Sequence, residues 1–202
     1  MIQSAERFVL FVRHADRPPI PKDDPYADVG LTESGQAAIG SLAAELKGRV
    51  CWTAASPYKR CQITADGLGA EPELDTRLGR PGPWIVSREE VFPEFEARGS
   101  MGVVRALVDG VKLPGMRSAE EAVPRLLAAG LERAARGSGV CVSHYSILMP
   151  AMAWLFGPAA AAEQLPPLDG FALELRDSGL VACWRGQERA VPERVSTHET
   201  TD

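Results

Sequence analysis

Three observations predict an α/β fold with a mostly parallel central sheet and helices on both of its faces. Runs at residues 8–12 and 139–142 are short and without charge, which is typical of strands buried on both faces of a parallel sheet. These runs alternate along the chain with segments of helical periodicity, the order of elements found in parallel sheets. The 202 residues suit one large domain with a sizeable core, and no repeat, low-complexity tract or linker divides them.

The first half of the chain is expected to contain two strands, each followed by a helix. A proline-rich loop separates the first strand from the first helix, and Gly48 lies just past the end of that helix. Ser56 and Pro57 are expected to be the N-cap and first residue of the second helix. The expected ranges are a strand at 7–13, a helix at 32–47, a strand at 50–55 and a helix at 56–67.

The second half begins with the least regular stretch, residues 71–115, and then becomes regular again. Ser118 and Glu121 form a capping-box pattern for a helix, and a hairpin turn is expected at 177–179. We take 1–202 as a single domain in which 190–202 form a loose tail. The expected ranges are a loop at 78–84, helices from 87, at 101–109, 118–136 and 146–156, and strands at 139–143, 171–176 and 180–185.

Composition excludes several classes of protein. Hydrophobic residues make up 45% and charged residues 24%, as in ordinary soluble proteins, and no apolar run approaches the roughly 18 residues of a membrane span. The N-terminus shows no secretion signal, so a cytoplasmic location is expected. Net charge is −5 and the basic residues are dispersed, which disfavours a nucleic-acid or membrane partner.

The four cysteines have neither metal-type nor redox-type spacing. Cys51, Cys61, Cys141 and Cys183 fall in expected strands or a helix, so they are interpreted as buried free thiols. Such thiols suit a reducing compartment.

Candidate catalytic residues collect at the ends of two buried strands. His14 directly follows the first strand, and His144 follows the strand at 139–143. Ligand sites of open α/β sheets lie at such carboxyl ends. Arg60, in the first turns of the helix after the second strand, can reach the same edge, whereas His198 lies in the expected tail and is taken as inert.

These residue types suit phosphoryl transfer. A neutral imidazole can attack phosphorus and hold the phosphoryl group, which replaces one displacement by two easier ones. Transfer of this kind is catalysed by positioning and by stabilising the charge on the phosphoryl oxygens. Arginine suits that task because its planar fork stays charged and binds phosphate bidentately. Arg13, Arg17 and Arg60 are the candidates, with His144 as a further donor.

Four segments, in the same order, resemble motifs of the histidine phosphatase superfamily, which includes phosphoglycerate mutases and acid phosphatases. Together they cover the chain from about residue 7 to 157, and their combination is far more specific than any one of them. The segments are Phe11-Val12-Arg13-His14-Ala15-Asp16-Arg17-Pro18, Leu31-Thr32-Glu33-Ser34-Gly35, Ser56-Pro57-Tyr58-Lys59-Arg60-Cys61-Gln62-Ile63-Thr64-Ala65 and Val142-Ser143-His144-Tyr145-Ser146.

The resemblance implies a phosphoglycerate mutase-like fold and a phosphatase that needs neither metal nor cofactor. It implies that His14 is the nucleophile and that Arg13, Arg60 and His144 form the phosphate pocket. Arg17 resembles an arginine of the acid-phosphatase branch that also binds phosphate. Ala15 departs from the pattern, because the family usually has glycine there.

The proton donor cannot be transferred from the family. The acid-phosphatase branch has aspartate directly after the second histidine, where this chain has Tyr145. The mutase-like branch often has glutamate just past an Arg-Leu pair, where this chain has Gly79. Glu89 is the closest to the family's spacing and is our candidate, with Asp16 as its rival. The acids considered beside them are Glu90, interpreted as a capping residue, Glu94 and Glu96.

The leading hypothesis is therefore a phosphatase acting on phosphate monoesters of a small metabolite, such as a sugar phosphate. The alternatives are a protein phosphohistidine phosphatase, a non-catalytic phosphate-binding member, a mutase, and a metal hydrolase using His14, Asp16 and His144. The substrate and the oligomeric state stay open. The apolar helix from Ser146 and the loop at Trp84 are candidate interfaces.

Overall fold

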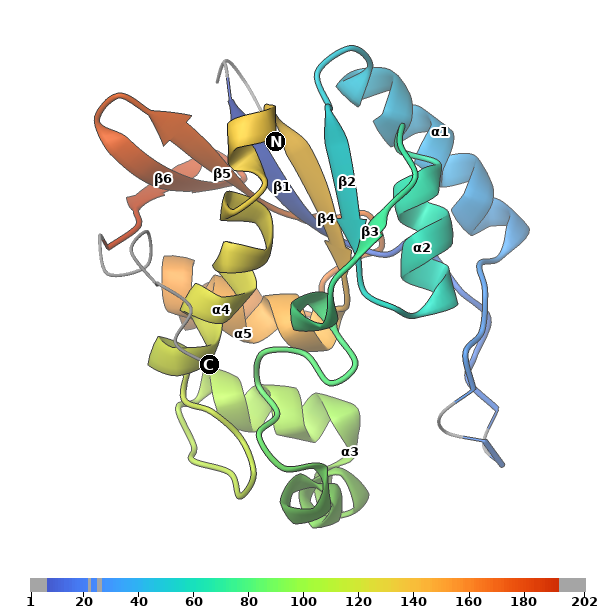
Figure 1. The fold of residues 1–202 in the computed structure, drawn as a ribbon. Coiled ribbons are helices and arrows are strands. Elements are labelled where there is room, and N and C mark those ends of the chain that lie inside the picture. The colour runs from blue at the N-terminus through green and yellow to red at the C-terminus, as the bar shows by residue number, and fades with distance from the viewer. Residues whose placement is uncertain (1–6, 22, 25–26, 193–202) are drawn as a thin grey trace.

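A computed structural model describes residues 7–21, 23–24 and 27–192. Its centre is a seven-stranded sheet with the strand order β3-β2-β4-β1-β5-β6-β7 (Figure 1). Neighbours among β3, β2, β4 and β1 are parallel, whereas β5, β6 and β7 add to β1 in antiparallel order. The predicted α/β class is confirmed, and the parallel pairing is concentrated in one half of the sheet.

The helices and strands follow the predicted order closely. In chain order they are β1 (Phe8–Arg13), α1 (Glu33–Leu46), β2 (Trp52–Ala55), α2 (Lys59–Asp66), β3 (Glu73–Leu74), the 3₁₀ turn η1 (Thr76–Leu78), α3 (Arg88–Val108), α4 (Ala119–Leu131), the 3₁₀ turn η2 (Ala134–Arg136), β4 (Gly139–Ser143), α5 (Tyr145–Phe156), the 3₁₀ turn η3 (Pro158–Ala161), β5 (Gly170–Arg176), β6 (Gly179–Trp184) and β7 (Gln187–Ala190).

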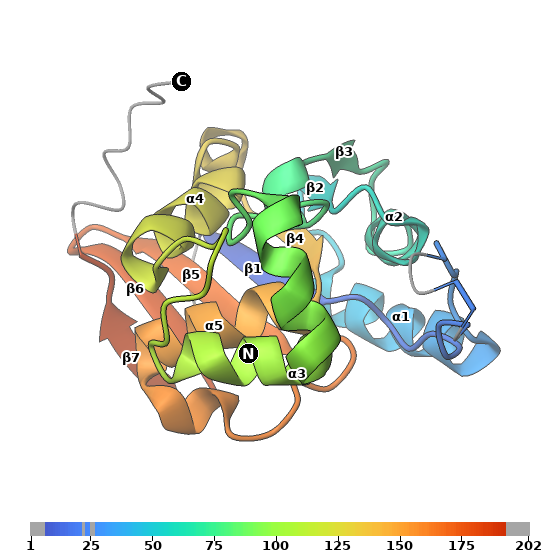
Figure 2. The same ribbon diagram turned by 90° about the horizontal axis from the view of Figure 1, so that it is seen from below.

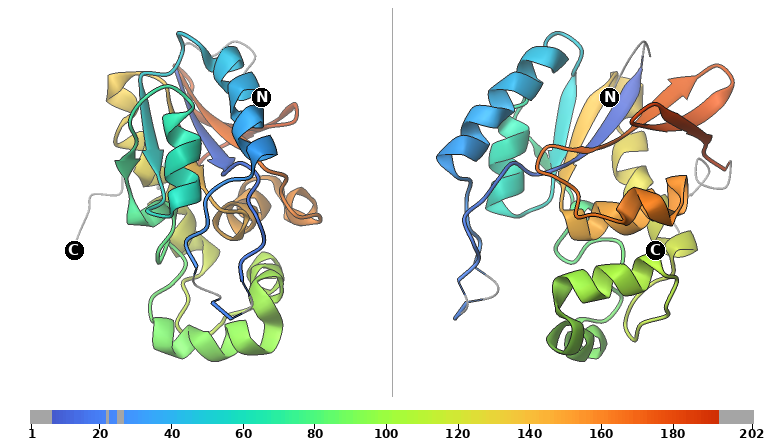
Figure 3. Two further views of the ribbon diagram at one scale, coloured as in Figure 1. Left: turned by 90° about the vertical axis from the view of Figure 1, so that its right-hand side faces the viewer. Right: turned by 180° about the vertical axis from the view of Figure 1, so that it is seen from behind.

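A layer of helices covers each face of the sheet (Figure 3). Alternate strand residues point to opposite faces, so each strand packs against both layers. In β1, Val9 and Phe11 pack into the core shared with α4 and α5. Leu10 and Val12 pack into the core shared with α1 and α2. Burial of β1 on both faces is what its uninterrupted apolar sequence predicts.

The capping pattern predicted for Ser118 and Glu121 is formed, and Thr32 and Ser87 cap two further helices. Thr32 caps α1 by accepting a hydrogen bond from the Gly35 amide. Ser87 caps α3 through the Glu90 amide, and the Glu121 carboxylate accepts from the Ser118 amide at the start of α4.

Ser56 is not the N-cap of α2, which corrects the prediction. The helix begins at Lys59 after Tyr58, whose side chain makes no capping bond. The Lys59 amide is instead bound by the Asp28 carboxylate, with 2.9 Å between Lys59 N and Asp28 Oδ1.

Strands β3 and β7 were not predicted. The two residues of β3 are both exposed, and all four residues of β7 are exposed, so neither carries the apolar pattern of a core strand. The tail expected at 190–202 is wrong at its start, because Ala190 ends β7 and Val191 is buried. The rest of that tail from residue 193, with His198, lies outside the described residues.

The parallel strands all end at one edge of the sheet, and α3 lies beyond that edge (Figures 1 and 2). Gly99 has φ 65° and ψ 169°, a backbone that is not helical, and it divides α3. The two segments on either side correspond to the two helices predicted from 87 and at 101–109.

Several surfaces expected from the sequence are buried inside the chain. Trp84 is 1% exposed, and its ring nitrogen donates to the Ile147 carbonyl on α5. Nine of the twelve residues of α5 are buried, so most of its apolar surface packs inside the chain. Three of the four free thiols are buried as predicted, but Cys51 is exposed because β2 begins after it.

No helix in the described ranges is long and apolar enough to cross a membrane.

Candidate active site

Three neighbouring parallel strands are each followed by a polar residue, and these three residues lie close together. Strands β2, β4 and β1 lie side by side, and the residues that follow them are Ser56, His144 and His14. The His14 amide donates to the Ser143 carbonyl at 2.9 Å, which continues the pairing of β1 with β4. The two imidazole rings meet edge to face, with 5.3 Å between their centroids. The predicted convergence of His14 and His144 is therefore observed in the structure.

One ring nitrogen of His14 has a backbone partner and the other is available for chemistry. Nδ1 lies 2.7 Å from the Ala15 carbonyl oxygen, which can only accept, so Nδ1 carries the hydrogen and donates it. Burial lowers the pKa of His14 to about 3, against the opposing bond to Ala15, and the charges of Arg60, Arg13 and Arg17 lower it further. His14 is therefore neutral at pH 7, with the lone pair on Nε2.

His144 is also neutral, and its tautomer follows from its partners. Arg60 Nη2 lies 3.4 Å from Nδ1, and an arginine can only donate, so Nδ1 accepts. The hydrogen is then on Nε2, which donates to Ser56 Oγ at 2.9 Å. Burial holds the pKa of His144 well below its usual range, and the neighbouring Arg60 lowers it further.

Arg60 is a buried cation with unused donors. It is 7% exposed, and its Nε and Nη1 have no hydrogen-bond partner among the described residues. Asp28 Oδ1 is 4.0 Å from Nη1, beyond hydrogen-bond distance. The guanidinium also stacks over the Tyr58 ring, 4.3 Å from its centroid.

Arg13 and Arg17 complete the positive surroundings of the histidines. Arg13 donates from Nη1 to the Leu165 carbonyl and lies over the Tyr145 ring, but its buried Nε has no partner among the described residues. Arg17 is half-buried and donates to the Pro18 carbonyl at 2.7 Å. Its charge lowers the pKa values of both His14 and His144.

Neither of the two proton-donor candidates, Asp16 and Glu89, contacts His14 or His144 in the described part of the chain. Asp16 is exposed, and its carboxylate accepts a hydrogen bond from Thr32 Oγ1 at 3.2 Å. The Thr32 amide also binds the Asp16 carbonyl, so this contact orders the loop after β1. Glu89 is exposed in the first turn of α3, and no contact joins it to the two histidines in the described chain.

Three further residues shape the surroundings of His144 and were not singled out from the sequence. Ser56 is fully buried and binds its ring nitrogen. The Cys61 thiol lies 3.5 Å from the same nitrogen, and burial raises its pKa to about 12. Gly79 lies so close that a methyl group on it would be 2.7 Å from His144 Cδ2. The Ser-Pro-x-x-Arg pattern was the signal available for Ser56, but it was interpreted as a helix cap.

An ion-pair network holds the chain just before Gly79. The Asp75 carboxylate binds Arg77, at 2.8 Å, and Arg133, at 3.0 Å. Arg77 also pairs with Glu132 at 2.7 Å, which ties η1 to the end of α4. This network fixes the position from which Gly79 approaches His144.

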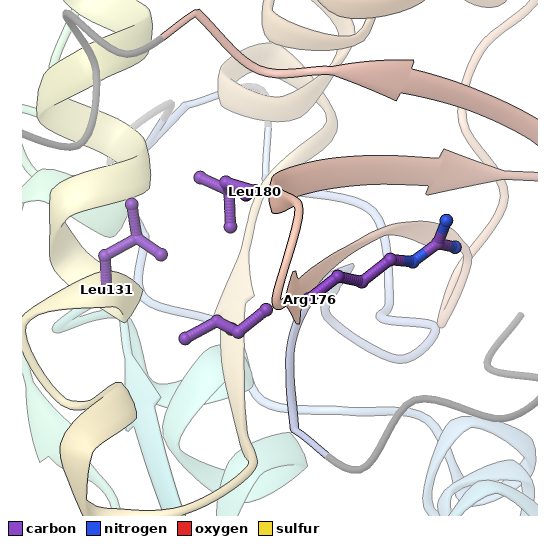
Figure 4. Close-up of a pocket in the computed structure, with 5 residues that line it drawn as sticks. Leu131, Arg176 and Leu180 are labelled. Atoms are coloured by element: carbon purple, nitrogen blue, oxygen red, sulfur yellow. The ribbon is translucent and has the colours of Figure 1, made fainter.

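Other candidate sites lie away from the histidines. A cavity of about 290 Å³ is lined by Leu131 and the β5–β6 hairpin (Figure 4). Nearby, Glu174, Cys183 and Glu188 are the one group in the described ranges that could hold a metal ion, but Arg176 already binds both carboxylates. His14, Asp16 and His144, which a metal hydrolase would need together, do not form such a group among the described residues.

Comparison with known proteins identifies the fold. No protein-family model matches the chain, and no curated protein matches it in sequence. Among solved structures, it is similar to a mycobacterial glucosyl-3-phosphoglycerate phosphatase, with 16% identity and a TM-score of 0.60 over 92% of this chain and 100% of that one. It is also similar to phosphoserine phosphatase from Entamoeba histolytica in complex with 3-phosphoglyceric acid, with 17% identity and a TM-score of 0.59 over 91% and 97% of the two chains. The predicted phosphoglycerate mutase-like fold is confirmed.

Proposed function

We propose that this chain is a metal-independent phosphatase of the histidine phosphatase superfamily, which hydrolyses phosphate monoesters of a small metabolite through a phosphohistidine on His14. The observation that carries the proposal is a buried, neutral imidazole with an available Nε2 beside buried guanidinium donors that lack partners. The four sequence motifs and the shared fold support it.

The unused donors call for an anion. A buried charged group without a hydrogen-bond partner is costly, so a folded protein keeps one where a ligand supplies the partner. Arg60 Nε and Nη1 and Arg13 Nε are three such donors. Arginine donors fit the oxygens of a phosphoryl group, whose charge they would stabilise during transfer. Arg13, Arg17 and Arg60 are accordingly proposed as phosphate-binding residues. His144 is proposed with them as a further donor, which requires its Nε2 hydrogen to turn from Ser56 to a phosphoryl oxygen when the substrate binds.

The reaction follows from the tautomer of His14. Nε2 attacks phosphorus with its lone pair as the bond to the leaving oxygen breaks, and the leaving group takes up a proton. The Nδ1–H bond to the Ala15 carbonyl is kept and stabilises the positive charge that the ring acquires. Water then attacks phosphorus and gives a proton to the carboxylate that protonated the leaving group. The N–P bond breaks, and phosphate leaves with His14 neutral again. Glu89 stays our proposed donor of the leaving group's proton, with Asp16 as its rival.

The substrate class is supported by the solved structures of the same fold. One of them is a glucosyl-3-phosphoglycerate phosphatase and another is a phosphoserine phosphatase, and both names describe small phosphorylated metabolites. We propose a substrate of this kind. A cytoplasmic location is proposed with it, because all four cysteines are free thiols and suit a reducing compartment.

A protein phosphohistidine phosphatase is the second candidate. The observation that favours it is that no carboxylate contacts His14 or His144 within the described part of the chain. A phosphoramidate has a better leaving group than an alkyl phosphate, so its cleavage needs less help from an acid.

A panel of phosphorylated metabolites and a phosphohistidine peptide, assayed in the presence of EDTA, tests the proposal. We expect hydrolysis of at least one phosphate monoester that EDTA does not reduce and that His14→Asn abolishes. Control measurements use Arg98→Gln, which changes an exposed arginine on α3 that pairs with Glu94. Activity that EDTA removes, or that survives in His14→Asn, would reject the proposed mechanism.

A further inference from the structure

The loop after η1 brings a fourth arginine close to the histidines. Gly79 has φ 142° and packs against both His144 and Ser56, so no side chain fits at this position. Arg80, the next residue, also has positive φ, at 70°. The chain thus turns sharply against His144, and the side chain that follows the turn is a cation.

Tyr58 connects Arg80 to the site. The Tyr58 ring stands edge-on to the His144 ring, with 5.2 Å between centroids. Arg80 lies over the same tyrosine, 5.1 Å from its centroid, and Arg60 lies over it at 4.3 Å. Arg80 is therefore one aromatic ring away from the proposed phosphate pocket.

Unlike the three inner arginines, Arg80 is open to a ligand. Its side chain is 51% exposed, and it donates no hydrogen bond to any residue within the described ranges. Among the residues that the structure describes, its one acidic partner is Asp28, at 3.9 Å from Nη1 to Oδ2.

Asp28 shows which chemical group fits beside these arginines. Its two carboxylate oxygens lie 4.0 Å from Arg60 Nη1 and 3.9 Å from Arg80 Nη1. Both distances are longer than a hydrogen bond, so the carboxylate neutralises the two guanidinium groups without using their donors. A ligand carboxylate that came closer would gain the charge-assisted hydrogen bonds that Asp28 does not make.

We propose that Arg80 binds a carboxylate on the leaving-group side of the substrate, so that the substrate carries a carboxylate in addition to its phosphoryl group. This inference rests on the proposed phosphatase function, because the phosphoryl group must be bound at Arg60 and His144 for Arg80 to face the remainder. Arginine suits the role because its fork matches a carboxylate bidentately.

The test compares two ligands that differ only in the carboxylate. They are 3-phosphoglycerate and glycerol 3-phosphate, in which a hydroxymethyl group replaces the carboxylate. Calorimetry with His14→Asn protein gives both Kd values without turnover. We expect 3-phosphoglycerate to bind more tightly than glycerol 3-phosphate, and Arg80→Gln to weaken only the former, by about 10-fold for a half-exposed charged contact.

Two further variants sharpen the test. Asp28→Asn keeps the oxygen that binds the Lys59 amide but removes the competing charge, so 3-phosphoglycerate should bind about twofold to fivefold more tightly. Arg98→Gln removes an equally exposed arginine on α3 and should change neither Kd.

The outcomes separate this inference from the proposed function. Equal Kd values for the two ligands, or equal weakening of both by Arg80→Gln, would overturn the role of Arg80 even if the protein hydrolyses phosphate monoesters. A selective loss in Arg80→Gln supports that role even if the wild-type protein fails to turn over either ligand, and that failure would count against the phosphatase proposal alone.

Discussion

A single backbone hydrogen bond decides which nitrogen of His14 can react. The Ala15 carbonyl holds the hydrogen on Nδ1 and so leaves the lone pair on Nε2. Burial and three nearby guanidinium groups keep the ring neutral. These effects act together, because a protonated His14 would have no lone pair with which to attack phosphorus.

Nuclear magnetic resonance of the ring nitrogens tests this state directly. Since the pKa of His14 is lowered to about 3, we expect the ring to stay neutral, with hydrogen on Nδ1, from pH 8 down to pH 5. The unfolded chain, with an ordinary histidine pKa of about 6.5, binds the extra proton first. Folding stability from this group is therefore complete above about pH 6.5 and declines as pH falls toward 3. A titration midpoint between pH 6 and 7 would contradict this description of His14.

Some residues of the candidate site could be predicted from the sequence and others could not. His14, His144 and Arg60 stand in motifs at strand ends, and the structure brings them together. Asp28 and Gly79 reach the site through loops whose paths depend on tertiary packing. Ser56 was assigned to the wrong partner, because a serine before a proline is typical of a helix cap and a buried histidine competes for the same oxygen.

Among the elements, those with a strong local pattern were predicted well. Strands β1 and β4 are apolar on both faces, and α1 and α4 have capping residues at their starts. Strands β3 and β7 lack such a pattern because they lie at the two edges of the sheet and are exposed. Their pairing is set by neighbouring strands and not by their own sequence.

The two candidate proton donors for the leaving group belong to different elements. Glu89 belongs to α3, beyond the carboxyl edge of the sheet, and Asp16 to the loop after β1. If Glu89 is the donor, Glu89→Gln should slow hydrolysis of 3-phosphoglycerate by at least about 10²-fold but barely affect p-nitrophenyl phosphate, whose leaving group needs little protonation.

Asp16→Asn and Glu90→Gln are measured beside it. Glu90 is the neighbour of Glu89 in the same turn, so its variant controls for the loss of charge at the start of α3. The selective loss appearing in Asp16→Asn instead would assign the donor to Asp16. Equal losses on both substrates in Glu89→Gln would assign Glu89 to folding or substrate positioning.

At the scale of the whole molecule, the order of the strands assembles the site. Strands β2, β4 and β1 are far apart in sequence but adjacent in the sheet, and all three run the same way. Residues 56, 144 and 14 therefore meet without any special loop. The antiparallel strands β5, β6 and β7 extend the sheet on the other side of β1, with β5 hydrogen-bonded to β1. They carry none of the proposed catalytic groups.

The measurement that tests the central claim most directly is detection of phosphate on His14 during turnover. The reaction with a hydrolysed substrate is quenched in denaturing alkali, in which phosphohistidine survives, and the peptide containing His14 is examined by mass spectrometry. We predict a phosphoryl group on His14 that acid treatment removes and that His14→Asn protein never acquires. Steady turnover with no phosphate on His14, or with phosphate on another residue, would contradict the proposed mechanism.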